Sequence, residues 1–355
     1  SPPVSTSPRE NLAQLIRHER ADWIPFTLDV GATPGLTAPV MDVFREQTGA
    51  DRPEEFFDFD FRTVSLPTRF GGDDPAALHA RVEPGTVFDE WGIGHWAGGA
   101  EGTYEKTFPP LATAANAGDV EALPTPAIDA GDTASIVETF HARGYPVFGY
   151  AGSIYEWSWW LRGMQQFMMD LLAAPDMAEA VIRKVTEYTK TLAQESARAG
   201  IDVLCFYDDA GMQTGLQIDP ELWRRFIRPR WHEVLDAVRS RFPETRFFLH
   251  SCGRIEEIIP DIVATGFDIL HPIQPECMDF ASIRRAVGRD ILLCATLSAQ
   301  TLFPFGTPRD IRSWVRDTKR LCAGDNGAIL CPSNRIQPET PWENIVAFAE
   351  EARAS

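Results

Sequence analysis

The stretch Phe247-Phe248-Leu249-His250-Ser251-Cys252-Gly253 joins an apolar run to an imidazole, a thiol and a glycine. Its first half has the composition of a buried strand, and the polar residues follow where that strand would end. His250 and Cys252 are two residues apart there, and nitrogen and sulfur are ligands that zinc prefers. A hydrogen-bonded histidine and a free structural cysteine fit the same pattern, because a lone His-x-Cys motif has little specificity.

An alternation of strands and helices extends on both sides of this stretch. Strands that alternate with helices run parallel, and their carboxyl ends meet at one edge. The pattern predicts an α/β fold, a (β/α)8 TIM barrel whose chemistry lies at that rim. The predicted strands are 23–29, 145–150, 202–207, 247–250, 267–272, 290–295 and 327–332, and the main helices are 8–20, 178–199, 219–238, 256–264, 308–322 and 342–352.

Residues 57–110 break this rhythm. They lack a long helical period and alternate apolar and polar residues between Gly and Pro, so we expect an antiparallel excursion inserted after the first strand. Trp91 in this segment is a candidate for lining a substrate mouth, unless it belongs to a simple hairpin surface. No linker composition marks a boundary, so residues 1–355 are predicted to form a single barrel domain. The Trp- and Met-rich residues 157–169 favour core packing or a homodimer face.

Carboxylates are predicted at two further strand ends. Asp208 and Asp209 follow the strand at 202–207, and Gln213, a few residues beyond them, is a candidate substrate contact. Two adjacent carboxyl groups at a barrel mouth are costly to desolvate together, so we expect one to have a raised pKa or to bind a cation, unless a loop leaves both solvated. Asp29 ends the predicted first strand and is a candidate substrate contact or the cap of a turn.

Composition restricts the partners and the compartment. A formal net charge of −18 argues against binding to nucleic acid or to an anionic membrane surface. The six cysteines lie in the second half of the chain without the short spacings of a disulfide scaffold, which favours a reducing cytoplasm. No stretch approaches the ~18 apolar residues of a membrane span, and residues 1–10 lack the apolar core of a signal peptide. We therefore expect a soluble cytoplasmic protein.

Several stretches, taken in order, resemble the uroporphyrinogen decarboxylase superfamily, which also contains the zinc-dependent corrinoid:thiol methyltransferases. The resemblance covers nearly the whole chain and is strongest from Tyr207 onward. It implies a barrel with an active site at the rim, and it does not specify one reaction. The stretches are residues 208–211, 218–221, 250–255, 266–274, 302–308 and 336–345.

One departure from the family pattern bears on the substrate. True decarboxylases of this superfamily carry an arginine-rich segment after the first strand that grips the carboxylates of the porphyrinogen. Here that place reads Asp29-Val30-Gly31-Ala32-Thr33-Pro34-Gly35, without an arginine. Decarboxylation of a porphyrinogen is therefore not expected, and the acidic net charge agrees with this.

A second departure concerns the metal. The thiol methyltransferases hold zinc with a His-x-Cys pair and a distant cysteine, and the resemblance assigns the pair to His250 and Cys252. The third position falls on Asn334 in this chain. Cys331, three residues earlier, and His271, where relatives usually have asparagine, are the candidates to complete the site.

The resemblance implies a zinc-dependent methyl or alkyl transferase that moves a methyl group between a small donor and a corrinoid or thiol acceptor, with any corrinoid on a separate protein. Asp208 and Asp209 would donate protons or orient other groups, and Tyr150 and Tyr207 would donate hydrogen bonds to the substrate. Asn334 is a candidate substrate contact. The alternatives are a decarboxylase-like lyase that performs Asp/His acid–base chemistry on a small carboxylated substrate, and a binding protein without catalytic activity.

Overall fold

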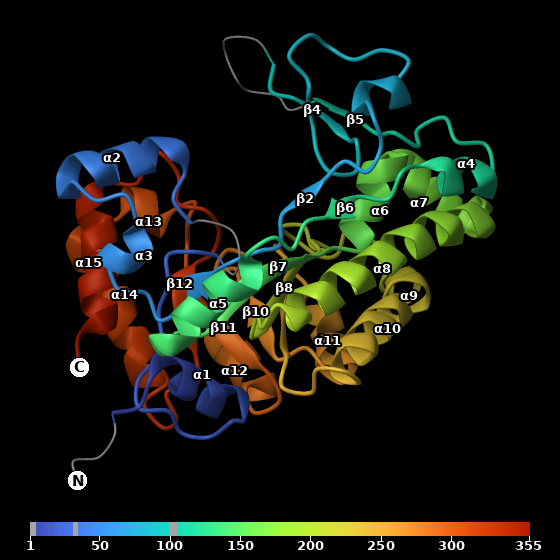
Figure 1. Cartoon of the computed structure of the whole chain (residues 1–355). Helices are drawn as coiled ribbons and strands as arrows, with labels where there is room; N and C mark the ends of the chain where they lie inside the picture. Colours follow the sequence, from blue (N-terminus) through green and yellow to red (C-terminus); the bar gives the residue numbers. More distant parts are fainter. Residues whose placement is uncertain (1–4, 31–34, 99–105) are drawn as a thin grey trace.

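The computed structural model describes residues 5–30, 35–98 and 106–355 (Figure 1). One curled parallel sheet forms its centre, with strands in the order β1-β7-β8-β9-β10-β11-β12, and helices surround that sheet. The α/β class is thus confirmed, and the arrangement is consistent with a TIM-like barrel. The strands are β1 Arg62–Thr63, β7 Val147–Gly152, β8 Val203–Tyr207, β9 Arg246–His250, β10 Ile269–His271, β11 Leu292–Leu297 and β12 Ile329–Pro332.

The predicted first strand at residues 23–29 is not a regular strand. Phe26 makes only an isolated parallel bridge to Leu330 of β12. Pro25 has no N–H to donate, which prevents a continuous ladder. On the other side of the segment, Asp60 Oδ2 accepts a hydrogen bond from the Phe26 N–H at 2.8 Å. The segment is therefore held by a few backbone hydrogen bonds to Leu330 and Asp60 and by the Asp60 side chain, without forming a regular strand.

The excursion predicted for residues 57–110 is not confirmed as a single antiparallel segment. Its beginning contains β1, which pairs in parallel with β7 and belongs to the main sheet. Further along, β3, β4 and β5 form a small antiparallel sheet that projects from the top of the molecule in Figure 1. A second antiparallel pair joins β2 to β6, which lies outside the predicted bounds. These short strands are β2 Thr68–Arg69, β3 Val87–Phe88, β4 Gly94–Trp96, β5 Lys106–Phe108 and β6 Ala127–Ile128.

Most helices fall close to their predicted places, but two of the predicted helices are divided. The helix predicted at 256–264 consists of the 3₁₀ helix η2 Glu256–Ile258 followed by α11 Ile259–Thr265. The helix predicted at 219–238 is divided at Ile227 into α9 and α10, and Pro229 lies at the start of α10, where its missing N–H costs nothing. Within the described residues, no helix combines the length and the apolar character needed to cross a membrane. The helices are α1 Pro8–Ile16, α2 Ala38–Thr48, α3 Pro53–Phe56, η1 Pro75–Leu78, α4 Ala117–Ala122, α5 Thr133–Ala142, α6 Tyr155–Arg162, α7 Met164–Ala173, α8 Pro175–Arg198, α9 Pro220–Phe226, α10 Arg228–Arg239, η2 Glu256–Ile258, α11 Ile259–Thr265, α12 Phe280–Val287, α13 Leu302–Phe305, α14 Pro308–Leu321 and α15 Trp342–Arg353.

Alternate residues of β9 pack into two different cores. Phe247 and Leu249 belong to the cluster shared with the helices around β8, β9 and β10. Phe248 belongs to a second cluster that consists largely of residues from successive strands and fills the inside of the sheet. Side chains alternate with a period of two along a strand, so His250 lies on the same inner face as Phe248. The predicted strand end therefore delivers its imidazole to the interior of the barrel.

Asp208 joins the end of β8 to the start of α6. Its side chain is buried, and a carboxylate at a helix N-terminus satisfies backbone N–H groups that have no partner within the helix. Burial raises the pKa of Asp208 to about 6, and the hydrogen-bond donors act in the opposite direction. We infer that Asp208 anchors α6. The donors are Ser153 Oγ (2.8 Å), Glu156 N (2.9 Å), Tyr155 N (3.2 Å), Trp231 Nε1 (3.2 Å) and Ile154 N (3.3 Å).

Replacing Asp208 is expected to destabilise the protein much more than replacing its neighbour. Asp208→Asn turns an amide toward several buried N–H donors and should lower the free energy of unfolding by about 3 kcal/mol. Asp209→Asn is the matched control, because its remaining oxygen still accepts the single N–H bond that Asp209 Oδ1 accepts from Cys252. Urea unfolding of the metal-free variants measures both. Equal losses of stability would contradict the anchoring role.

Candidate metal site

Three aromatic rings stand in a row across β8, β9 and β10. The parallel register pairs Tyr207 with His250, and His250 with His271. The ring centroids of Tyr207 and His250 are 4.6 Å apart, and those of His250 and His271 are 5.0 Å apart. Neighbouring strands are separated by about 4.8 Å, so the register itself stacks the rings. His250 is thereby held between two rings, with one edge turned toward the strand ends.

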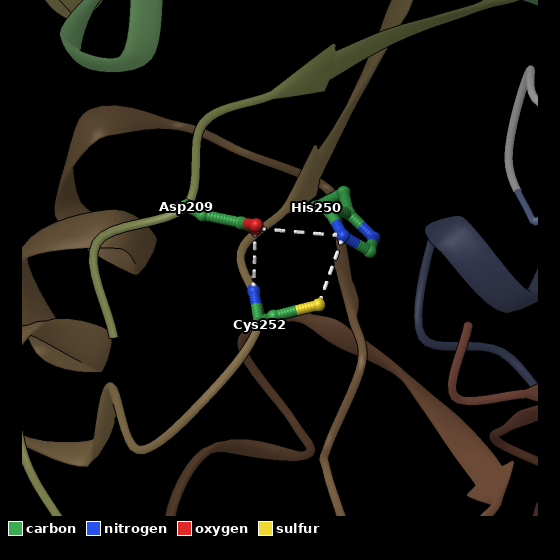
Figure 2. A group of neighbouring side chains, drawn as sticks. All are labelled: Asp209, His250 and Cys252. Carbon is green, nitrogen blue, oxygen red and sulfur yellow. Dashed lines mark hydrogen bonds and ion pairs between the residues drawn. The ribbon is translucent and has the colours of Figure 1, made fainter. Parts of the chain in front are cut away.

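Asp209, His250 and Cys252 meet beyond the ends of β8 and β9 (Figure 2). His250 Nε2 lies 3.2 Å from Cys252 Sγ and 3.5 Å from Asp209 Oδ1. Ligand atoms bound tetrahedrally to one zinc ion are separated by roughly 3.4–3.6 Å, given zinc bonds of about 2.0–2.3 Å. Within the described part of the chain, this is the one group of three or more His, Cys, Asp or Glu side chains whose potential ligand atoms all lie within 4.8 Å of one another. The donor set fits zinc.

Two glycines bring the loops after β8 and β9 into backbone contact. A Cβ atom on Gly253, which has a φ of +84°, would lie 2.6 Å from the backbone carbon of Gly211. A Cβ atom on Gly211 would lie 2.5 Å from the carbonyl oxygen of Cys252. The Arg254 N–H donates to the Met212 carbonyl across the same contact, at 2.8 Å. Only glycine permits this approach, which sets Asp209 against Cys252.

The electrostatics of the group favour the addition of a cation. Burial lowers the pKa of His250 to about 3, so the ring is neutral and can present a lone pair. Burial and the nearby charge of Asp209 raise the pKa of the Cys252 thiol above its usual range, and burial raises the pKa of Asp209. Burial therefore disfavours the charged forms of both acids when no positive charge is close, and a divalent cation would favour those charged forms.

The structure does not bring His271 or Cys331, the other predicted metal ligands, into this group, and Asn334 was predicted as a substrate contact. His271 is fully buried, with Nδ1 at 2.8 Å from His250 Nδ1 and Nε2 at 3.0 Å from the Pro332 carbonyl oxygen. Cys331 is buried within β12, in the inner cluster. Asn334 is exposed, and its Nδ2 lies 3.7 Å from Cys252 Sγ. Of the three, Asn334 alone contacts one of the grouped residues from the side of the solvent.

Of the two predicted tyrosines, Tyr207 stacks on His250 of the group, and Tyr150 packs against Tyr207. The rings of Tyr150 and Tyr207 are 5.6 Å apart, and the Tyr207 hydroxyl donates to the Val30 carbonyl. Asp29, next to Val30, accepts a hydrogen bond from the Gly35 N–H at 3.2 Å, and burial raises its pKa to about 6. Residues 31–34, at which the missing arginine was noted, lie outside the described residues.

The remaining predicted substrate contacts have different environments. Trp91 is fully buried, and its ring packs edge-on against those of Trp157 and Tyr188. It therefore belongs to a core between the projecting segment and α8, which corrects the expectation of a residue at a mouth. Gln213 is exposed in the loop after β8.

Glu156 is a further acidic residue at the site that the sequence analysis did not select. It lies in the first turn of α6, and its Oε1 accepts a hydrogen bond from the Asp209 N–H at 2.5 Å. Burial and the charges of Asp209 and Asp208 raise its pKa well above the usual value. In the sequence, Glu156 is only an acidic residue within an aromatic-rich stretch. No motif distinguishes it from an ordinary acidic residue of the surface.

Comparisons with known proteins give relatives of two kinds. A uroporphyrinogen decarboxylase from Trichodesmium erythraeum is 28% identical over 183 residues, which cover 50% of this chain and 48% of that protein. A methylated-thiol–coenzyme M methyltransferase from Methanosarcina mazei is 24% identical over 184 residues (50% and 45%), and a methylcobamide:CoM methyltransferase from Methanosarcina barkeri is 24% identical over 189 residues (53% and 52%). The chain spans about half the length of these relatives.

A solved structure shares the fold over almost the whole chain. It is a methyltransferase from Methanosarcina mazei, with a TM-score of 0.69 and 18% sequence identity, and the match covers 98% of both chains. The family model described as uroporphyrinogen decarboxylase (URO-D) matches residues 96–355, a range that contains Asp209, His250 and Cys252. This chain therefore belongs to the uroporphyrinogen decarboxylase family.

Proposed function

We propose that this chain is a zinc-dependent methyl (alkyl) transferase of the URO-D family that moves a methyl group between a small donor and a corrinoid or thiol acceptor. The observation that carries the proposal is the group of Asp209, His250 and Cys252. Three protein ligands leave one position open for substrate, which is the arrangement of catalytic zinc sites. Two of the relatives are methyltransferases by name, and both names include coenzyme M.

The proposed roles follow from the contacts. When bound, zinc would supply a Lewis acid that keeps a thiol as a nucleophilic thiolate at neutral pH. His250 and Cys252 hold the metal, and Asp209 replaces the third ligand that the β12 loop lacks. Asn334 donates toward Cys252 Sγ from the solvent side, where it can also meet a substrate. Tyr150 is a proposed donor to the substrate, Tyr207 would have to exchange its bond to the Val30 carbonyl for one to the substrate, and Asp208 acts through its anchoring of α6.

A groove of about 630 Å³ extends from Asn334 along the rim and offers a route for substrate. Its lining includes the amides of Gln300 and Gln337 and the exposed ring of Phe305.

The methylcobamide in one relative's name supports a corrinoid as the methyl carrier, which we place on a separate protein. We further propose that residues 1–355 act as one domain, and that the segment 157–169, where Met164 is 40% and Met169 is 52% accessible, serves a homodimer.

A decarboxylase-like lyase is the second candidate. It is favoured by the 3.5 Å approach of Asp209 to His250 and by the buried Glu156 beside Asp209, which together offer acid–base groups without a metal. The two proposals differ in their need for metal. With free methylcobalamin and a small thiol, a transferase loses its activity after treatment with a chelator and regains it with zinc. Release of CO2 from a carboxylated substrate that is insensitive to chelator would favour the lyase.

The first prediction from this proposal concerns metal content. Protein purified without added zinc is expected to contain about one zinc ion per chain, measured by mass spectrometry of the metal after dialysis. Cys252→Ala removes a thiolate ligand and should lose the metal. Cys277→Ala is the matched control, because Cys277 is a free and similarly half-buried cysteine outside the group. Zinc-free wild-type protein, or equal loss in both variants, would contradict the proposal.

The second prediction concerns pH. The Cys252 thiol has a raised pKa and must lose its proton to bind zinc, whereas His250, with a pKa of about 3, is already unprotonated above pH 5. Zinc affinity should therefore rise with pH, by up to roughly tenfold per unit between pH 6 and 8. Chelator competition at several pH values measures this. An affinity that stays constant over the same range would show that no proton is released on binding.

The third prediction separates Asp209 from the structural acids. Asp209→Asn removes the third ligand while it keeps the hydrogen bond from Cys252 N, so zinc affinity and methyl transfer should both fall by at least about tenfold while the fold is preserved. Glu156→Gln keeps an acceptor for the Asp209 N–H and should retain the zinc. Both variants are compared by chelator competition and circular dichroism. Unchanged zinc affinity in Asp209→Asn would exclude Asp209 as a ligand.

A further inference from the structure

We propose that His271 is a positioning residue that fixes the tautomer of His250, so that the Nε2 lone pair of His250 faces Asp209 and Cys252. The sequence analysis predicts His271 as a candidate metal ligand. We assign it instead the role of a residue that positions a ligand. The proposal rests on the metal site proposed above. It adds a residue that decides whether that site can bind metal at all.

Three groups are joined by two hydrogen bonds: His250, His271 and the Pro332 carbonyl. The direction of both bonds follows from the Pro332 carbonyl. The carbonyl oxygen of Pro332 can only accept, so His271 Nε2, at 3.0 Å, must donate to it. We take His271 as neutral, and in a neutral imidazole the other ring nitrogen is then an acceptor. His271 Nδ1 lies 2.8 Å from His250 Nδ1, so His250 Nδ1 carries the proton and donates it. His250 Nε2 is left with a free lone pair.

That lone pair is directed toward the candidate metal ligands. His250 Nε2 is the ring atom that lies 3.2 Å from Cys252 Sγ and 3.5 Å from Asp209 Oδ1. A metal-binding histidine must present an unprotonated nitrogen, and its tautomer is set by the partner of its other nitrogen. His271 supplies this partner from the neighbouring strand.

Without His271, the local contacts would favour the opposite tautomer. Asp209 and Cys252 both offer acceptors near His250 Nε2, so a proton on Nε2 would find partners there. A proton on Nδ1 would be buried without an acceptor, which costs as much as a lost hydrogen bond or more. His271 is 0% exposed, and His250 is 5% exposed, so bulk water reaches neither ring freely. The acceptor on His271 therefore decides between the two tautomers.

The same contacts argue against His271 as a ligand. Both of its nitrogens are already engaged, one with His250 and one with the end of β12. The ring is stacked on that of His250, with 27° between their planes, and on that of Phe248, with 24°. Turning His271 toward the group would break both hydrogen bonds and both stacking contacts.

The tautomer can be measured directly on the metal-free wild-type protein. Nitrogen-15 NMR of selectively labelled histidine, with His250 assigned by comparison with a His250→Gln variant, separates protonated from unprotonated ring nitrogens. The expected spectrum shows a protonated Nδ1 and an unprotonated Nε2 for His250. A protonated Nε2 on His250 would overturn the proposal, and this result needs neither bound zinc nor a variant at position 271.

Two near-isosteric variants test the consequence for metal binding. His271→Asn places an oxygen close to the position of Nδ1 and keeps an acceptor for His250, whereas His271→Leu removes it. In chelator competition, the Leu variant should bind zinc about 10–100-fold more weakly than wild type, and the Asn variant within about threefold of it. Equal loss in both variants would indicate that His271 is itself a ligand, and no loss in either would show that it is dispensable. Each of these results overturns the proposal.

Two further results decide between the possible explanations of these outcomes. Thermal unfolding of the metal-free variants shows whether both are folded; if the Leu variant is not, the NMR result on the wild-type protein decides. If the wild-type protein binds no zinc, the proposed function fails, while the NMR spectrum still tests the tautomer. Failure of the metal site and failure of the His271 assignment are therefore distinguishable.

Discussion

The hydrogen-bonded register of β8, β9 and β10 is the constraint on which the site depends. It places Tyr207, His250 and His271 at equivalent positions of adjacent parallel strands, so their rings stack at the spacing of the strands. A shift of one residue in β9 would turn His250 toward the helices and bring Leu249 inside. The apolar residues of β9 oppose such a shift, because Phe247 and Leu249 are already buried on the helical side. The packing of the apolar residues of β9 thus stabilises the barrel and also orients the imidazole of His250 toward its interior.

Much of the fold could be predicted from the sequence because buried parallel strands and amphipathic helices have strong periodic patterns. β7 to β12 and the long helices fall within a few residues of their expected positions. β1 could not be found, since two residues paired with β7 leave no period to read. The segment around Phe26 has the composition of a strand, yet Pro25 and a side-chain contact from Asp60 decide its structure. The range 57–110 is not confirmed as one antiparallel unit. Its strands β1 and β2 pair with β7 and β6, which both lie beyond residue 110.

The candidate site was predictable to the extent that its residues follow strand ends. His250, Cys252 and Asp209 stand out on this basis, and the structure brings them together. Asp208 anchors α6, whereas Asp209 belongs to the candidate metal site. Two adjacent carboxylates in the sequence do not predict this difference, because it depends on the direction of each side chain beyond β8. Asp208 meets the start of α6, and Asp209 meets Cys252. Likewise, His271 differs from a ligand only through its partners, His250 and the carbonyl of Pro332, and these contacts depend on tertiary structure.

The last partner in this chain of contacts is a backbone atom. Any residue at position 332 would present a carbonyl oxygen, so the contact with His271 needs no particular side chain in β12 or in the loop that follows it. The loop also carries Asn334 and part of the rim groove. If the proposed substrate contact at Asn334 holds, exposed side chains of this loop can be changed while the orientation of His250 is retained. This separation makes the exposed positions 334, 335 and 337 the ones to vary by protein engineering, since Ser333 and Ile336 are buried.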